Sequence, residues 1–310
     1  MYLLILDFSA EDYKKALQPK FPDLSIFTST SEDEIGDVIE KAEVLFATRV
    51  SDSLIRKASN LKWIQAKTAG VDALVNLPSL RKDVLLTSMR GIHGPQMSEM
   101  AILLMLALNR DLPRVIRNQD QGIWERWPGR LLSQKNVGIL GVGAIGEAIA
   151  QKCKAFGMRV YGIDILKRKI KAIDSFHGPE ELLQILPEID YLIIVAPLTP
   201  QTHRLIGIEA LSVMKSSAFL INIGRGEIVD EEALIDALKR GKIAGAALDA
   251  FSTEPLPKGH PFWTMENVIV TPHVGGLSDI YVEQALPIFE ENLQRFLRGE
   301  RETLINRVDR

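Results

Sequence analysis

Short apolar runs alternate with helical patterns along most of the chain. In the first third, runs that predict strands cover residues 2–8, 43–49, 61–67 and 84–87, with helical patterns between them. In the middle, further runs cover residues 136–141, 159–164, 190–197, 218–224, 243–250 and 267–272. Strands that alternate with helices form parallel sheets with both faces covered. The pattern therefore predicts an α/β fold built from two doubly wound parallel-sheet domains.

Two long helical patterns flank the middle block. One covers residues 98–130, and the other, which Pro287 should interrupt, covers residues 278–298. A chain of 310 residues favours two domains. We expect the two helical stretches to be the crossings between them. The sequence then predicts one domain from residues 1–98 plus 279–310 and a second from residues 99–278.

Composition excludes several classes of function. The net charge of −3 gives no basic surface for nucleic acid. The longest apolar run, residues 100–108, is far shorter than the roughly 20 residues that span a bilayer, so no membrane span is expected. The single cysteine, Cys153, fits a reducing compartment, and the N-terminal residues lack the pattern of a signal peptide. We expect a cytoplasmic protein.

A glycine motif lies where the strand at residues 136–141 meets a helix. The stretch "VGILGVGAIGEAIA" contains Gly141, Gly143 and Gly146 with the G-x-G-x-x-G spacing. In this context Gly141 makes a tight turn, Gly143 lets the backbone approach a pyrophosphate, and Gly146 lets helix and strand pack closely. The helix N-terminus supplies N–H groups to the phosphates. The motif predicts a dinucleotide site in a Rossmann domain.

An acidic residue ends the next predicted strand. Asp164 stands about 20 residues after the glycines, where a carboxylate bonds the adenosine ribose and repels a 2′-phosphate. The position favours NAD over NADP. Lys167, Arg168 and Lys169 follow, and basic residues there either serve NADP or form a solvated helix face.

Three further polar side chains follow ends of predicted strands. Arg225 stands between two glycines, and a guanidinium there can grip a carboxylate with its planar fork. Glu254 and His273 follow the next two strands. A carboxylate beside a histidine fixes its tautomer and favours the imidazolium form. Ligands bind at carboxyl ends of strands in such folds, so the three side chains predict a chemical site. The sequence contains no His, Cys and carboxylate cluster with metal-ligand spacing, so no metal is expected.

The successive motifs resemble those of the D-isomer-specific 2-hydroxyacid dehydrogenases, a family that includes glyoxylate/hydroxypyruvate reductases and phosphoglycerate dehydrogenases. The carriers of the resemblance are "GVGAIG", "INIGRGEIVDEEAL", "GAALDAFSTEPLP" and "NVIVTPHVGG", together with "LKWIQAKTAGVDAL", "LLTSMRGIHGPQMSE" and "IFEENLQRFLRGE". They occur in order over nearly the whole chain.

The resemblance implies roles for particular residues. Arg225 would bind the substrate's carboxylate and carbonyl oxygen, His273 would be the acid/base, and Glu254 would orient His273. The backbone of Ala69, Gly70 and Val71 would hold the carboxylate from the other domain. The implied cofactor-binding residues, His273 included, are Gly141, Gly143, Ala144, Ile145, Gly146, Asp164, Ala196, Pro197, Ile223, Asp249, His273 and Gly275.

The same resemblance implies an architecture and a reaction. A flavodoxin-like substrate domain and a Rossmann cofactor domain would be hinged around a cleft, and the protein would be a homodimer. The reaction would be hydride transfer between NAD(H) and a small D-2-hydroxy acid/2-oxo acid pair, such as glyoxylate or hydroxypyruvate. Met100 stands where many members of the family have a histidine or an aromatic residue, and the roles of Met100, Trp124 and Trp127 stay unassigned.

Other functions on the same scaffold stay open at this point. Formate dehydrogenases pair the histidine with glutamine, so Glu254 argues against that activity, whereas a phosphite dehydrogenase could keep all three side chains. The C-terminal-binding corepressors resemble the family and act as NADH-responsive interaction proteins. Turnover of a 2-oxo acid distinguishes an enzyme from such a binding protein.

Overall fold

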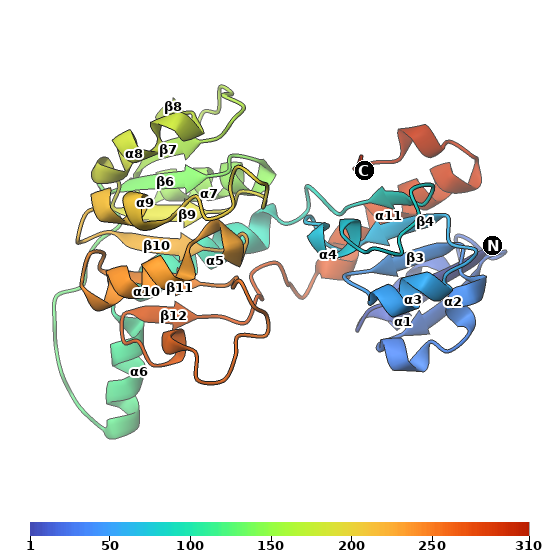
Figure 1. The fold of residues 1–310 in the computed structure, drawn as a ribbon, viewed down its shortest axis with the longest axis horizontal. Helices are drawn as coiled ribbons and strands as arrows, with labels where there is room; N and C mark the ends of the chain where they lie inside the picture. Colours follow the sequence, from blue (N-terminus) through green and yellow to red (C-terminus); the bar gives the residue numbers. More distant parts are fainter. Residues whose placement is uncertain (310) are drawn as a thin grey trace. The chain divides into compact units, whose positions relative to one another are not determined.

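The computed structural model describes residues 1–309. Its contacts divide the chain into two compact units (Figure 1). The discontinuous unit consists of Met1–Ile92 and Ser278–Arg310, and the central unit consists of His93–Leu277. Within the described residues, each unit has one sheet in which all strands are parallel.

The discontinuous unit contains a five-stranded sheet in the order β2-β1-β3-β4-β5 among residues 1–309. Helix α11 packs its apolar side chains, among them Phe289, against the aromatic side chains of this sheet. The strands are β1 (Tyr2–Leu6), β2 (Ser25–Ser29), β3 (Val44–Ala47), β4 (Trp63–Ala66) and β5 (Leu85–Thr87). The helices are α1 (Ala10–Leu17), α2 (Val38–Lys41), α3 (Asp52–Lys57), α4 (Asp72–Val75) and α11 (Tyr281–Leu297).

The central unit contains a seven-stranded sheet in the order β12-β11-β10-β9-β6-β7-β8 within the same described range. Its strands are β6 (Asn136–Leu140), β7 (Arg159–Ile163), β8 (Ser175–His177), β9 (Tyr191–Ile194), β10 (Phe219–Asn222), β11 (Gly245–Leu248) and β12 (Val268–Val270). Its helices are α5 (Gly94–Asn109), α6 (Leu112–Gln121), α7 (Ala144–Ala155), α8 (Leu182–Ile185), α9 (Ile208–Val213) and α10 (Glu231–Lys239). Separate hydrophobic clusters pack on the two sides of this sheet.

The strand order positions the loops that matter for function. Because all strands are parallel, their carboxyl ends lie at one edge of each sheet. In the central sheet the order reverses between β9 and β6, which is where such folds bind ligands. The α/β fold with two doubly wound parallel sheets, predicted from the alternating runs, is confirmed.

Three local expectations were wrong. The helical stretch expected over residues 98–130 is two helices, because Asp111 adopts a left-handed conformation with φ 52° and Gly122 ends α6 with φ 65°. Helix α11 continues through Pro287. This proline is on the exposed side of the helix, where water can reach the carbonyl that it leaves unpaired. The edge strands β2 and β8 were missed because their short, partly polar sequences give little apolar signal.

Candidate active site

The glycine turn after β6 assigns each glycine a different task. Gly141 has φ 97°, and a Cβ on it would lie 2.5 Å from the backbone N of Ala196. A Cβ on Gly146 would lie 2.2 Å from the carbonyl oxygen of Gly141, so these two glycines are required by packing. A Cβ on Gly143 would meet nothing within 4 Å. Gly143 directly precedes α7, so open space lies where a ligand phosphate could approach the helix N-terminus.

Asp164 directly follows β7 and faces the glycine turn. Its Oδ2 accepts a hydrogen bond from the backbone N–H of Val142 at 2.7 Å, and its Oδ1 accepts one from Leu166 at 3.1 Å. Because a carboxylate offers about four acceptor positions, capacity for ribose hydroxyls remains.

Two basic side chains beside Asp164 already have partners. The ammonium of Lys167 lies 2.8 Å from Oε2 of Glu181. Hydrogen bonds from Lys167, Gly178 and His177 lower the pKa of Glu181 to about 2. The guanidinium of Arg168 donates to the carbonyl oxygen of Val142. Lys167 is therefore held toward β8, whereas Arg168 lies beside the glycine turn.

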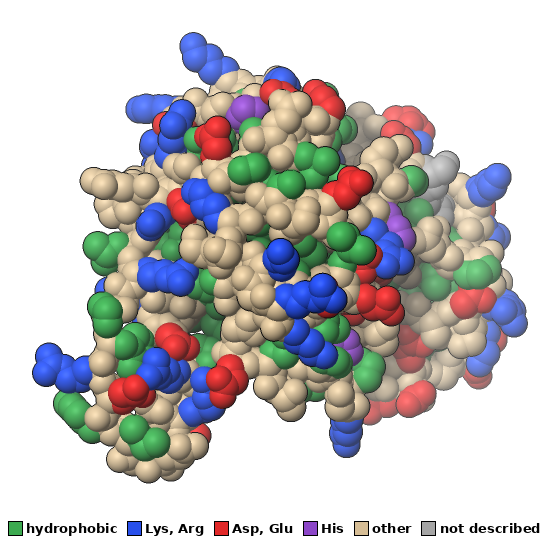
Figure 2. Space-filling model, turned by 60° about the vertical axis from the view of Figure 1, so that its left-hand side comes forward, with side chains coloured by type: hydrophobic (Ala, Val, Ile, Leu, Met, Phe, Trp, Pro, Cys, Tyr) green, Lys and Arg blue, Asp and Glu red, His purple; other side chains and the backbone are tan. Residues whose placement is uncertain are grey.

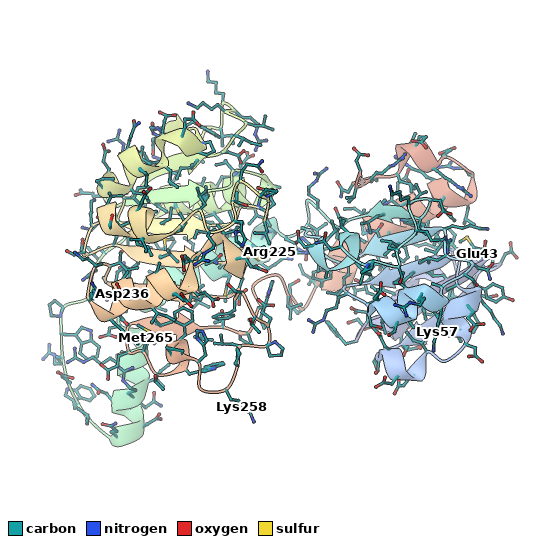
Figure 3. All side chains as sticks on the ribbon, in the orientation of Figure 1. Glu43, Lys57, Arg225, Asp236, Lys258 and Met265 are labelled. Carbon is teal, nitrogen blue, oxygen red and sulfur yellow. The ribbon has the colours of Figure 1, made fainter. Side chains whose placement is uncertain are left out.

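Arg225 lies in a tightly built loop at the carboxyl edge of the central sheet (Figure 3). The side-chain amide of Asn222 donates to the carbonyl oxygen of Arg225 at 2.9 Å and its Oδ1 accepts from Gly224 N at 3.1 Å. A Cβ on Gly226 would lie 1.9 Å from the carbonyl carbon of Phe251. The glycine after Arg225 therefore lets this loop contact the backbone that follows β11. These contacts fix the backbone of Arg225, whose side chain is half-buried.

His273 and Glu254 form a close pair. Nδ1 of His273 lies 2.9 Å from each carboxylate oxygen of Glu254, and the two side chains are 43% and 32% exposed. Oε1 of Glu254 also accepts a hydrogen bond from the backbone N–H of Phe251 at 3.0 Å. The carboxylate is thus held from one side and holds the imidazole on the other. With Nδ1–H directed at Glu254, Nε2 is the ring nitrogen available to exchange a proton with a ligand.

Asp249 fixes the backbone on both sides of His273. This carboxylate is 1% exposed, and its oxygens accept hydrogen bonds from the hydroxyl of Thr271 at 2.6 Å and from the N–H groups of Val274 at 3.0 Å and Gly275 at 2.9 Å. His273 itself has φ 53°, a strained region for a side chain of this kind. The three hydrogen bonds offset that strain. The resemblance implied only that Asp249 binds the cofactor, and sequence patterns gave no sign of this second task.

Met100, to which the sequence assigned no role, packs against the turn that follows His273. A Cβ on Gly275 would lie 3.1 Å from Cγ of Met100 and 3.3 Å from the sulfur of Met97. Both methionines are buried side chains of α5. Met100 therefore supports the glycines that follow His273.

The remaining predicted cofactor residues lie on loops and at one helix start of the central unit. Ile223 and Ala196 are buried directly after β10 and near the end of β9, whereas Pro197 is exposed. Ala144 is exposed and Ile145 half-buried in the first turn of α7. All of these residues lie near the carboxyl edge of the central sheet.

The residues predicted to hold a carboxylate form a short segment between β4 and α4 in the discontinuous unit. The hydroxyl of Thr68 donates to the carbonyl oxygen of Gly70 at 2.6 Å, and Met89 N donates to the carbonyl oxygen of Thr68 at 3.0 Å. Within residues 1–309, the backbone N–H groups of Ala69, Gly70 and Val71 donate no hydrogen bond. Unpaired consecutive N–H groups are suited to an anion.

The described chain has neither a metal-binding cluster nor a membrane-crossing helix. Over residues 1–309, no group of three or more His, Cys, Asp or Glu side chains is arranged to hold a metal ion. Over the same residues, no helix combines the length and apolar character that crossing a membrane requires.

Known proteins resemble the chain in sequence. The D-3-phosphoglycerate dehydrogenase of Methanocaldococcus jannaschii is 33% identical over 304 residues, which are 96% of this chain and 58% of that protein. The chain thus spans little more than half the length of that relative. The glyoxylate reductase of Korarchaeum cryptofilum is 32% identical over 264 residues, which are 83% of this chain and 79% of that protein.

Solved structures resemble it over almost the full length. A D-isomer specific 2-hydroxyacid dehydrogenase family protein from Aeromonas salmonicida has a TM-score of 0.90 at 34% identity and covers 99% of this chain and 98% of its own. The D-isomer specific 2-hydroxyacid dehydrogenase from Xanthobacter autotrophicus, crystallised with NADPH and MES, has a TM-score of 0.85 at 33% identity with the same coverage.

The sequence profile of one family also matches the central unit. The profile describes the NAD binding domain of the D-isomer specific 2-hydroxyacid dehydrogenases, and it matches residues 102–275. This range contains the glycine turn, Asp164, Arg225, Glu254 and His273. The chain therefore belongs to the D-isomer specific 2-hydroxyacid dehydrogenase family, and residues 102–275 are its NAD-binding domain.

Proposed function

We propose that this protein reduces a small 2-oxo acid, such as glyoxylate or hydroxypyruvate, to the D-2-hydroxy acid with NADH, and catalyses the reverse reaction. The observation that carries the proposal is the group of Arg225, Glu254 and His273 on successive loops at one edge of the central sheet. A general acid held by a carboxylate, with a guanidinium on the next loop, suits reduction of a carbonyl beside a carboxylate.

Each side chain has a distinct part in this mechanism. Bound NADH supplies the hydride that reaches the carbonyl carbon. Arg225 stabilises the negative charge that grows on the carbonyl oxygen, and its planar fork also binds the substrate's carboxylate. His273 delivers a proton from Nε2 to that oxygen, while the carboxylate of Glu254, 2.9 Å from Nδ1, fixes the orientation of the ring.

The discontinuous unit supplies backbone donors in the same proposal. The N–H groups of Ala69, Gly70 and Val71, which donate no hydrogen bond within residues 1–309, bind the substrate's carboxylate. These backbone groups would orient the substrate's carboxylate without a charged side chain.

Cofactor selection rests on Asp164. Its carboxylate, held by Val142 and Leu166, is placed to accept the ribose hydroxyls of NADH and to repel a 2′-phosphate. Lys167 is engaged by Glu181 and does not offset that charge. Arg168 lies beside the glycine turn and is the side chain able to weaken the preference.

The active form in this proposal is a homodimer that assembles through the central unit. None of the residues of α6 is buried, and the arm of residues 111–131 carries exposed apolar side chains (Figure 2). They are Leu112, Val115, Ile116, Ile123, Trp124 and Leu131. A second copy would cover them. Light scattering of the purified protein should give twice the 34.6 kDa chain mass, and a monomer would refute this assembly.

The buried thiol of Cys153 fits the reducing cytoplasm.

Turnover of a substrate panel tests the function. Glyoxylate, hydroxypyruvate, pyruvate and other small 2-oxo acids are offered with NADH and with NADPH, and formate and phosphite are offered with NAD⁺. The proposal predicts oxidation of NADH with at least one 2-oxo acid and formation of the D product. Binding of NADH without any turnover would favour an interaction protein instead, and reduction of NAD⁺ by phosphite alone would favour a phosphite dehydrogenase.

A further inference from the structure

The discontinuous unit buries an ion pair that the proposed mechanism does not use. Nζ of Lys67 lies 2.6 Å from Oδ2 of Asp7, and the two side chains are 4% and 3% exposed. The pair between Lys62 and Glu43 in the same sheet has side chains that are 49% and 24% exposed. Taking two charges out of water is costly before their attraction is counted, so such a pair is weak evidence of a contribution to stability.

Aromatic rings enclose the ammonium group. Nζ of Lys67 lies 4.0 Å from the ring centroid of Phe8 and 4.9 Å from that of Tyr281. Both distances are within the range of cation–π attraction. The other oxygen of Asp7 accepts a hydrogen bond from Ser9 N at 2.9 Å. The ammonium is therefore confined to one position.

The pair spans one strand of the sheet. Asp7 directly follows β1 and Lys67 directly follows β4, and β3 lies between these strands. The position beyond β1 and β3, where this strand order reverses, is where a flavodoxin-like sheet binds its ligand. Here the side chain of Lys67 extends across that edge.

The backbone of Lys67 is anchored as well. Its N–H donates to the carbonyl oxygen of Ala47 at 2.9 Å, and its carbonyl oxygen accepts from the hydroxyl of Tyr281. Burial raises the pKa of Tyr281 above its ordinary value, so the hydroxyl keeps its proton at any working pH. The N–H, the carbonyl group and the side chain of Lys67 are thus each held by a different element.

The segment that Lys67 precedes is Thr68–Val71, whose N–H groups donate no hydrogen bond within residues 1–309. Unpaired N–H groups bind an anion well only when they already point to one place, because ordering them on binding costs affinity. We propose that Lys67 is a positioning residue which, through Asp7 and Tyr281, holds the segment of residues 68–71 in the conformation that receives the substrate's carboxylate.

This inference rests on the proposed function, because the carboxylate belongs to the proposed substrate. Lys67 acts through the backbone and does not touch the substrate. Its charge is neutralised by Asp7, so its loss should change how well the acid binds and leave the chemical step alone. The inference therefore predicts a change in KM without a matching change in kcat.

The test replaces both charges at once. Lys67→Met alone would leave the Asp7 carboxylate buried without its partner and could unfold the protein. In the double variant Asp7→Asn/Lys67→Met, the asparagine oxygen can still accept from Ser9 N and no buried charge is left. Steady-state kinetics with the best 2-oxo acid should show a KM raised about tenfold or more, with kcat within about threefold. The Kd of NADH should not change.

A second variant and a control complete the design. Tyr281→Phe keeps the ring but removes the hydroxyl that anchors Lys67, and it should raise KM in the same direction. This variant decides the question if the double variant does not fold. Lys62→Met breaks the exposed pair with Glu43 and should leave KM unchanged. Glu43, labelled in Figure 3, directly precedes β3 and is thus at the amino end of that strand. Calorimetric titration of the NADH-bound protein with oxamate, an unreactive 2-oxo acid analogue, gives an independent affinity.

The outcomes separate the two proposals. If the unmodified protein turns over no 2-oxo acid, the proposed function fails, and the inference about Lys67 falls with it. If the unmodified protein is active and the folded variants keep its KM and its oxamate affinity, Lys67 has only a structural role and this inference alone is overturned. A kcat that falls while KM stays unchanged would also overturn it.

Discussion

The two sheets of this protein have the same parallel construction, but their carboxyl edges differ in chemistry. In the central unit this edge carries Arg225, Glu254 and His273, and the last two side chains are 32% and 43% exposed. In the discontinuous unit, Lys67 and Asp7 follow the strand ends, and they are buried against each other. What remains there is a row of N–H groups at residues 69–71 that find no acceptor within the described chain.

Under the proposed function, the difference lets one fold serve two purposes. A reaction that moves a proton needs an acid/base side chain that a partner orients, and the loops after β11 and β12 would provide one. Recognition of a carboxylate needs only donors held in place, and main-chain N–H groups provide those. We expect the central edge to be sensitive to the identity of its side chains and the discontinuous edge to be sensitive mainly to its backbone.

The largest effect expected from this contrast concerns Arg225. Arg225→Lys keeps the charge and loses the planar fork, so kcat/KM for 2-oxo acid reduction should fall about a hundredfold or more, as for loss of a buried charge partner. NADH affinity should change little. Arg240→Lys, in an exposed pair with Asp236, is the matched control and should have no effect. Near-normal turnover in Arg225→Lys would mean that the fork is not used.

Two glycines of the central edge should respond in opposite ways. Gly143→Ala places a methyl group in open space, so the protein should stay as stable while NADH binds about tenfold or more weakly. Gly226→Ala places it against the backbone of Phe251 and should lower the free energy of unfolding by about 2 kcal/mol or more. Thermal unfolding and NADH titration of both variants measure the contrast. A stable Gly226→Ala protein or an undiminished NADH affinity in Gly143→Ala would contradict the assignment.

A smaller effect is expected in the choice of cofactor. The Asp164 carboxylate should favour NADH over NADPH in kcat/KM by about tenfold, which corresponds to about 1.4 kcal/mol. Arg168→Ala should widen the ratio, because Arg168 is the basic side chain beside the glycine turn. Equal kcat/KM for the two cofactors would show that Asp164 does not control the selection.

The smallest effect is expected at the backbone edge of the discontinuous unit. Val71→Ala shortens a side chain and leaves the N–H group in place, so KM for the 2-oxo acid should stay within about threefold. Val71→Pro removes the N–H group and should raise KM clearly. If the alanine variant loses as much as the proline variant, the side chain rather than the backbone is the ligand.

The sequence predicted the parts of the fold that repeat a strong pattern. Fully buried strands such as β9 and β10 are continuous apolar runs, and the glycine turn has a fixed spacing. The edge strands β2 and β8 carry few buried side chains, so their pattern is weak. The break at Asp111 depends on a left-handed backbone that non-glycine residues adopt only when their surroundings require it.

The placement of the candidate site residues was predictable where each follows a strand, and contacts between residues distant in sequence were not. Arg225, Glu254 and His273 each follow a recognisable strand. The second task of Asp249 arises from hydrogen bonds to a loop more than 20 residues away. The pair of Lys67 with Asp7 joins strands that are neighbours of β3 and not of each other. Composition and periodicity do not predict contacts of this kind.

The central claim is that Glu254 holds His273 so that the imidazole can give a proton to the substrate. The most direct measurement is kcat/KM for 2-oxo acid reduction in the unmodified protein, Glu254→Gln and His273→Gln. Glutamine keeps a hydrogen-bond acceptor but removes the negative charge. Because a charge-assisted hydrogen bond is roughly twice as strong as a neutral one, kcat/KM should fall about tenfold or more in Glu254→Gln. His273→Gln should lose about a hundredfold or more. An unchanged kcat/KM in Glu254→Gln would contradict the account, because the carboxylate would then not hold the imidazole for proton delivery.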